Sequence, residues 1–176
     1  MKKIPCMFER EGTPYRAINK VAVDVTGAIP TIKFDGACCM VKHGLLYKRR
    51  LIKSGKPIPK GFIHVETRPD NGKTLGWVPV SINNSDHKYF LVPPIPTEDG
   101  TYELVGEKVQ GGLYGKKYKF LKHGSNILID DVPTDFHGLE AYLANSDIEG
   151  IVWWKDDEPI AKIKRVDFGI PWGKKL

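Results

Sequence analysis

Short apolar segments separated by Gly, Pro and Asp turns dominate this sequence, and a single stretch has helical spacing. The strand-like segments are residues 21–25, 37–41, 45–50, 150–154 and 160–165. Short segments bounded by turn residues are typical of antiparallel sheet. The chain has 176 residues, which is long enough for one hydrophobic core. The pattern therefore predicts an α+β fold dominated by antiparallel sheet, in a single domain spanning residues 1–176.

Two turn sequences predict hairpins. His43-Gly44 separates residues 38–42 from residues 45–50 and has hairpin-turn chemistry. The polar stretch 155–159 joins the last two strand-like segments in the same way. Each pair of segments is therefore expected to form an antiparallel hairpin.

The expected helix follows Thr134, a residue type that caps helix N-termini. Phe136, Leu139, Tyr142 and Leu143 then fall on one helical face. This face is expected to pack on the sheet.

The overall charge favours a polyanionic partner. Lys and Arg number 27 against 21 Asp and Glu, so the formal net charge is +6. A basic solvated surface is the alternative explanation for the same charge. The lysine-rich loop 53–60 and the tail residues Lys174 and Lys175 are candidate phosphate contacts.

The three cysteines, Cys6, Cys38 and Cys39, favour reduced thiols that pack in the interior. Adjacent Cys38 and Cys39 point to opposite faces of a strand, so neither a disulfide nor a zinc site follows from them. No apolar run reaches membrane-spanning length, and the N-terminus does not read as a signal peptide. We expect a cytoplasmic protein with no membrane association and no obligate protein partner.

The stretch Lys33-Phe34-Asp35-Gly36 contains the candidate reactive residues. In an extended strand Lys33 and Asp35 point to the same side, so both can enter one site. Gly36 lets the backbone approach a ligand closely. A lysine near other cations loses its proton more easily and becomes a nucleophile.

Three later segments occur in the order found in covalent nucleotidyltransferases. They are residues 102–107 (Tyr-Glu-Leu-Val-Gly-Glu), 148–153 (Ile-Glu-Gly-Ile-Val-Trp) and 161–165 (Ala-Lys-Ile-Lys-Arg). With Lys33 they resemble the collinear motifs of DNA ligases, RNA ligases and mRNA-capping enzymes. Residues 35–39, 75–80 and 149–153 are also similar to an ATP-dependent RNA ligase family that includes a vertebrate 5′-to-3′ RNA ligase. The similarity runs in patches from Thr31 to Trp172.

The resemblance implies two mainly antiparallel sheets around a nucleotide cleft, an ATP-grasp-like nucleotidyltransferase domain. It implies that Lys33 attacks the α-phosphorus of ATP, and it places Ile32, Asp35 and Gly36 at the nucleotide. Lys162 and Lys164 alternate on a strand and so share one face, where they can hold the α-phosphate. An exposed basic strand edge is the alternative for these two lysines.

The resemblance also suggests contacts to the rest of the nucleotide. Glu103 matches the RNA ligase family at the position that contacts the ribose, and Glu107 is the alternative candidate for this contact. Arg49 suits the sugar or phosphate because its guanidinium is planar and bidentate. Phe120 is the candidate for stacking on adenine, with core packing as the alternative. Glu149 is the candidate ligand of Mg²⁺ or Mn²⁺, because hard cations prefer oxygen ligands.

Few residues follow the Lys162 motif, so we expect no C-terminal OB-fold or helical specificity domain. The favoured function is an ATP-dependent RNA ligase that joins 5′-phosphate and 3′-hydroxyl RNA ends through a covalent lysyl-AMP intermediate. The alternatives are a GTP-dependent capping guanylyltransferase and a non-catalytic nucleotide- or RNA-binding relic of the same fold.

Overall fold

The computed structural model describes residues 1–128 and 131–173, so the predicted phosphate contacts Lys174 and Lys175 lie outside the described residues. The chain forms two compact units. Unit 1 is Met1–Lys2 with Asp35–His123, and unit 2 is Lys3–Phe34 with Gly124–Leu176. The chain passes between the units after Lys2, after Phe34 and after His123, so the Lys33 motif contributes residues to both.

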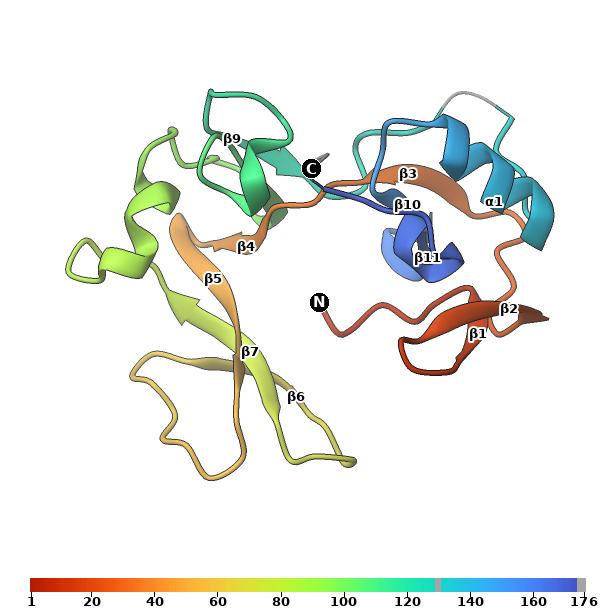
Figure 1. Cartoon of the computed structure of the whole chain (residues 1–176). Helices are drawn as coiled ribbons and strands as arrows, with labels where there is room; N and C mark the ends of the chain where they lie inside the picture. The colour runs from red at the N-terminus through yellow and green to blue at the C-terminus, as the bar shows by residue number, and fades with distance from the viewer. Residues whose placement is uncertain (129–130, 174–176) are drawn as a thin grey trace. The chain divides into compact units, whose positions relative to one another are not determined.

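Unit 1 is built on a six-stranded antiparallel sheet, in the order β6-β7-β5-β4-β8-β9. Its strands are β4 (Ala37–Lys42), β5 (Leu45–Ile52), β6 (Ile63–Thr67), β7 (Thr74–Pro79), β8 (Gly100–Val105) and β9 (Lys119–Lys122). In Figure 1 β5 and β7 run side by side, and β4 leads directly into β5. Two 3₁₀ helices, η1 (Ser85–Leu91) and η2 (Gln110–Gly112), lie in the connections before and after β8.

The two faces of this sheet differ in character because side chains alternate along each strand. Cys39, Tyr102 and Leu104 are buried on one face, in a core that also contains Leu46 and Phe90. Cys38 and Glu103, which pair directly across β4 and β8, point to the other face. That second face also carries Arg49, next to the buried ring of Trp77.

Unit 2 contains a three-stranded antiparallel sheet and a two-stranded one. The larger has the order β11-β10-β3, with β3 (Ile29–Lys33), β10 (Gly150–Lys155) and β11 (Glu158–Lys164). The smaller pairs β1 (Phe8–Glu11) with β2 (Arg16–Val21). The α-helix α1 (Phe136–Asn145) and the 3₁₀ helix η3 (Arg165–Phe168) complete the described part of this unit.

The core of unit 2 lies between α1 and one face of the three-stranded sheet (Figure 1). Leu139 and Leu143 of the helix are fully buried together with Ile151, Trp153 and Ile163 of the sheet. Burying each side chain of this size stabilises the folded state by roughly 1.5–3 kcal/mol. The opposite face of the same sheet carries polar side chains as well as apolar ones such as Val152.

Both predicted hairpins form. Lys42 pairs with Leu45 across His43 and Gly44, whose φ angles of 51° and 72° are those of a type I′ turn. The second hairpin turns at Asp156 and Asp157, with φ angles of 51° and 60°, so its turn is two residues long instead of the expected 155–159. Asp tolerates the left-handed region, which allows this tighter turn.

Two expectations about local structure were wrong in detail. Asp135, not Thr134, caps α1, since its side chain accepts from the Gly138 N–H at 2.8 Å. The strand expected over residues 21–25 ends at Val21. There the backbone N–H groups of Ala22 and Val23 both donate to the Met7 carbonyl, and Asp24 begins a local turn with Thr26.

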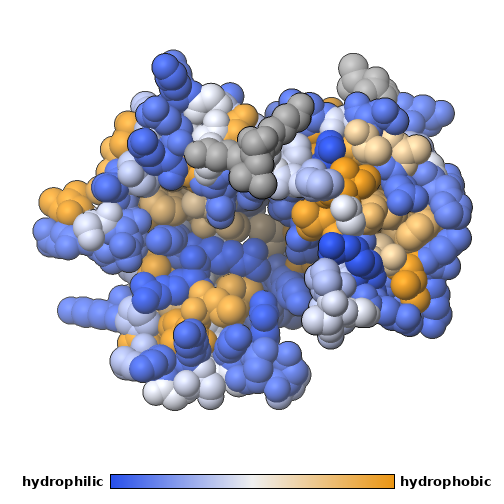
Figure 2. Space-filling model, in the orientation of Figure 1, coloured by the Kyte–Doolittle hydropathy of each residue, from blue (hydrophilic) through white to orange (hydrophobic). Residues whose placement is uncertain are grey.

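The fold is therefore mostly antiparallel sheet with a single α-helix among the described residues, as the strand pattern predicted. On the face shown in Figure 2, hydrophilic side chains cover most of each unit and hydrophobic ones gather in smaller areas. Within residues 1–128 and 131–173, no helix is both long enough and apolar enough to cross a bilayer.

Candidate functional site

Three lysines of unit 2 lie on one face of its three-stranded sheet. Gly150 pairs with Lys33 on one side and with Lys164 on the other. Lys162 lies two residues before Lys164 and therefore points the same way. This shared face is the one turned away from α1, because the alternate residues Ile151 and Ile163 pack in the core.

Gly150 keeps the strands close where the lysines meet. A Cβ at this position would lie 2.2 Å from the Ile163 carbonyl oxygen and 2.9 Å from the Lys164 Cα. No other residue fits without shifting the backbone. The Glu-Gly sequence before β10 therefore has a packing reason as well as a chemical one.

Glu149, the residue before β10, forms an ion pair with Lys33. The Lys33 ammonium lies 2.5 Å from Glu149 Oε2 and also donates to the Phe34 carbonyl at 3.5 Å. The two side chains keep 23% and 10% of their accessible surface. The backbone of Glu149 is fixed, because its carbonyl accepts a hydrogen bond from the Arg165 N–H at 2.9 Å. The predicted nucleophile and the predicted metal ligand are thus in contact.

The surroundings of Lys162 perturb its amine. Burial, and then the positive charges of Lys33 and Lys164, lower the pKa of Lys162 to about 8. Its backbone is fixed by the segment Pro5–Met7, because the Lys162 N–H donates to Pro5 and its carbonyl accepts from Met7. A desolvated ammonium beside two like charges is stabilised by any anion that binds there.

Ile32 lies on the opposite face of β3 from Lys33, in register with Ile151. Its backbone N–H donates to the Asn126 carbonyl at 2.9 Å. Its side chain therefore does not share the face that carries the lysines.

Asp35 and Gly36 are positioned by other residues of unit 1. The Asp35 N–H donates to the Tyr114 hydroxyl at 3.0 Å, and the Gly36 N–H donates to Glu103 Oε1 at 3.0 Å. A Cβ at Gly36 would lie 2.3 Å from the Leu104 carbonyl oxygen and 2.8 Å from Glu103 Cγ. Gly36 is therefore required for the close approach of this segment to β8.

Glu103 is buried and also pairs with His123, whose Nε2 lies 2.9 Å from Glu103 Oε2. Donor atoms of Cys38, Glu103 and His123 lie within 4.8 Å of one another, a geometry that a metal ion can occupy. Burial and the Glu103 charge raise the pKa of Cys38 to about 11, so at neutral pH the thiol keeps its proton. Glu103 and His123 satisfy each other within this group, so the three residues form a polar cluster on this face of the sheet.

The remaining predicted site residues of unit 1 lie in three different settings. Arg49 is on β5 and donates to the Lys2 carbonyl at 3.3 Å. Glu107 is exposed beyond the end of β8, after Gly106 breaks the strand. Phe120 faces the apolar core, with its ring edge-on to Tyr102 at a centroid distance of 6.4 Å. Glu103 and Phe120 are thus on opposite faces of the sheet, since Phe120 pairs with Leu104.

Two residues near these groups had no predicted role. His123 lies just after β9 and contacts Glu103, a pairing that depends on the β8–β9 register. Arg68 lies just after β6 and lines a cavity with Arg49. His123 lies in a segment that resembles the RNA ligase family but carries no assignable role there, and for Arg68 the only signal was its basic character.

The chain is similar over almost its whole length to proteins named RNA ligase 1. The protein from Pongo abelii is 24% identical over an alignment 267 positions long, which covers 97% of this chain and 82% of that protein. Those from Rattus norvegicus and Mus musculus are each 23% identical over 265 residues and 97% of this chain. No family model matches the sequence. These similarities support a distant, RNA ligase-like relationship.

Proposed function

We propose that this protein is an ATP-dependent RNA ligase that joins 5′-phosphate and 3′-hydroxyl RNA ends through a lysyl-AMP intermediate. The observation that carries the proposal is the convergence of Lys33, Lys162 and Lys164 on one sheet face, with Glu149 paired to Lys33. The similarity to proteins named RNA ligase 1 points to the same chemistry. In this proposal both units belong to one adenylyltransferase domain.

The first step forms one bond and breaks another. The lone pair of Lys33 Nζ attacks the α-phosphorus of ATP, a P–N bond forms, and the bond to the pyrophosphate leaving group breaks. The Lys33 ammonium gives up one proton before Nζ can attack and a second as the P–N bond forms, and Glu149 Oε2 is the carboxylate in contact with it. A 5′-phosphate oxygen then attacks the same phosphorus and releases the lysine. The 3′-hydroxyl finally displaces AMP from the RNA-adenylate.

Lys162 and Lys164 stabilise the negative charge that builds on the phosphate oxygens. Lys162, with a pKa of about 8, is still mostly protonated at pH 7 and can serve as a cation there. An ammonium that the fold has already desolvated interacts strongly with an incoming phosphate, since little water must be removed. This makes Lys162 the stronger candidate for the α-phosphate contact.

Glu149 fits the divalent ion that such a reaction requires, because a carboxylate oxygen is the ligand type that Mg²⁺ and Mn²⁺ prefer. Such an ion, when bound, neutralises charge on the phosphates. Glu149 therefore has two partners in this proposal, the Lys33 ammonium and the cation. Asp35, Gly36 and Glu103 would contact the nucleotide, as the family resemblance suggests.

The test is covalent labelling of the protein with α-³²P-ATP or α-³²P-GTP and Mg²⁺, read on a denaturing gel. We expect label from ATP, and none in Lys33→Ala or in Lys33→Arg, whose guanidinium stays protonated. Lys155→Ala, which removes an exposed lysine of the same unit, is the control and should label normally. Label from GTP alone would indicate a capping enzyme. The absence of any label in the wild type would indicate a binding protein.

A further inference from the structure

A cavity of about 350 Å³ opens on unit 1, and the charged side chains that line it are cations. Arg49 and Arg68 contribute guanidinium groups, and Gln110 and Cys38 contribute an amide and a thiol. Leu51 and Leu75, which pair across β5 and β7, form its apolar part. The cavity is therefore lined by both basic and apolar side chains.

Arg68 carries an unsatisfied donor at this cavity. Its Nε is buried and has no hydrogen-bond partner among the described residues. Its backbone is fixed, because its N–H donates to Lys73 and its carbonyl accepts from Gly72 at 2.9 Å each. A buried guanidinium donor without a partner costs stability unless a ligand accepts from it.

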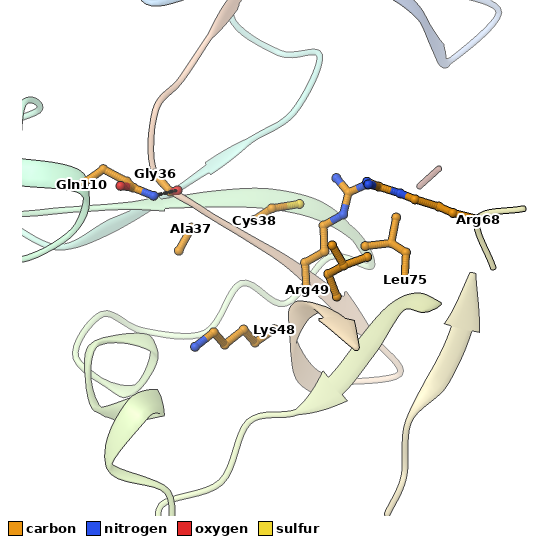
Figure 3. Close-up of a pocket in the computed structure, with 9 residues that line it drawn as sticks. Gly36, Ala37, Cys38, Lys48, Arg49, Arg68, Leu75 and Gln110 are labelled. Carbon is orange, nitrogen blue, oxygen red and sulfur yellow. Dashed lines mark hydrogen bonds between the residues drawn. The ribbon is translucent and has the colours of Figure 1, made fainter. Parts of the chain in front are cut away.

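Arg49, on β5, lines the same cavity. Figure 3 shows the side chain of Arg68 extending toward the guanidinium of Arg49, while Lys48 points away from both. Lys48 instead lies 5.6 Å from the Phe90 ring, on the other face of the sheet. Two guanidiniums that converge repel each other in the absence of an anion between them.

The charge state and hydrogen bonds of the other groups at the cavity are compatible with a bound anion. The Cys38 thiol is protonated at neutral pH and brings no negative charge. The nearby Glu103 carboxylate is held by the Gly36 N–H and by His123. Gln110 donates to the Gly36 carbonyl at 3.5 Å, which orients its amide at the cavity edge.

We infer that this cavity binds the terminal 5′-phosphate of an RNA strand. Each guanidinium presents two parallel donors, so two of them together match a group with three free oxygens. A terminal phosphate has three such oxygens, whereas an internal phosphodiester has two. Leu51 and Leu75 then contact the sugar of the first nucleotide. The inference rests on the proposed RNA ligase function for the identity of the ligand.

The same terminal-phosphate chemistry occurs in the γ-phosphate of ATP, so the experiment must separate the two. Binding to the full chain is measured by fluorescence anisotropy in EDTA, where adenylation does not occur. The probes are RNA strands of one sequence with a 5′-phosphate or a 5′-hydroxyl, and ATP is the competitor. We expect the 5′-phosphate to improve affinity about tenfold, and Arg68→Gln to remove most of that preference.

The matched control is Lys119→Gln, which removes one positive charge from an exposed position on β9 outside the cavity lining. It should keep the 5′-phosphate preference even if overall RNA affinity falls. Arg68→Lys keeps the charge but loses the planar pair of donors, and we expect an intermediate preference. Thermal melting of each variant shows whether it is folded.

Three results would overturn the inference. One is a wild-type protein that binds both RNA ends equally. Another is an undiminished preference in folded Arg68→Gln. The third is a variant that loses ATP competition but keeps the 5′-phosphate preference, which would assign the cavity to the nucleotide. Because no step here requires lysyl-AMP, failure of this inference and failure of the adenylation chemistry are read separately.

Discussion

The ammonium of Lys33 contacts the carboxylate of Glu149 at 2.5 Å, although 116 residues separate them in the sequence. The contact follows from sheet register, because Lys33 ends β3 and pairs with Gly150, the residue next to Glu149. Both side chains are largely shielded from solvent, so the pair is weakly screened by salt. In the proposed chemistry Lys33 and Glu149 are therefore expected to act together.

Glu149→Ala should slow self-adenylation about a hundredfold or more at limiting Mg²⁺, because it removes an oxygen ligand and the partner of the Lys33 proton. The initial rate of label incorporation measures this effect. Part of the activity should return at high Mg²⁺ or with Mn²⁺. Glu158→Gln, an exposed change on β11, is the control. A near-normal rate in Glu149→Ala would remove this residue from the site.

Lys162 should make the stability of the fold depend on pH above neutrality. Its pKa is lowered to about 8 by burial and by the charges of Lys33 and Lys164. The unfolded chain therefore binds more protons between pH 8 and the normal lysine pKa near 10.4. The contribution of Lys162 to the free energy of unfolding is unfavourable below pH 8 and is relieved as pH rises through this window.

Lys162→Met should accordingly raise the free energy of unfolding at pH 7 by on the order of 1 kcal/mol. Urea denaturation at pH 7 and pH 9.5 measures it, and the gain should shrink at the higher pH. Lys155→Met, at an exposed position, should show neither effect. A loss of stability in Lys162→Met at pH 7 would mean that the folded protein stabilises this ammonium.

Glu103 should stabilise unit 1 through the Gly36 backbone. Glu103→Ala removes the acceptor of the Gly36 N–H and should lower the free energy of unfolding by about 2 kcal/mol. Glu103→Gln should cost less, because an amide oxygen still accepts from Gly36. Urea denaturation of the two variants gives the comparison. If both variants lose the same free energy of unfolding, the effect comes from the Glu103 charge that faces His123 and not from the Gly36 contact.

Local turn chemistry made two parts of the fold predictable. The hairpins at His43-Gly44 and at Asp156-Asp157 follow from residues that adopt positive φ. The strand expected over residues 21–25 did not form, because the alternation of Val21, Val23 and Val25 does not follow strand pairing, and Val21 at the end of β2 is 57% exposed. Val25 is indeed buried, but the chain has already left β2.

The candidate site was predictable where motif residues share a strand. Lys162 and Lys164 face the same way on β11, as their spacing required. Contacts set by long-range register were not predictable. The Glu103–His123 pair needs the β8–β9 register, and the convergence of Arg68 with Arg49 needs the β5–β7–β6 order. A single sequence does not show which strands pair, so it carries no signal for either of these two contacts.

The adenylated protein should join RNA ends and discriminate against DNA strands of identical sequence. A basic chain with net charge +6 binds nucleic acid largely through phosphates. If three or more phosphates are contacted, raising salt from about 50 mM to about 200 mM should weaken joining roughly tenfold or more. The preference for RNA must then come from contacts to 2′-hydroxyl groups, which salt affects less.

The experiment compares 5′-phosphorylated RNA and DNA, each single-stranded and nicked, at both salt concentrations. Supplying RNA that already carries the 5′-adenylate isolates the final joining step, and self-adenylation measured in parallel shows that the protein is active. We expect the salt effect on both nucleic acids and the RNA preference at both salt concentrations. Sealing of nicked DNA as fast as RNA would exclude the RNA ligase assignment while leaving adenylation at Lys33 intact, because that step requires neither strand.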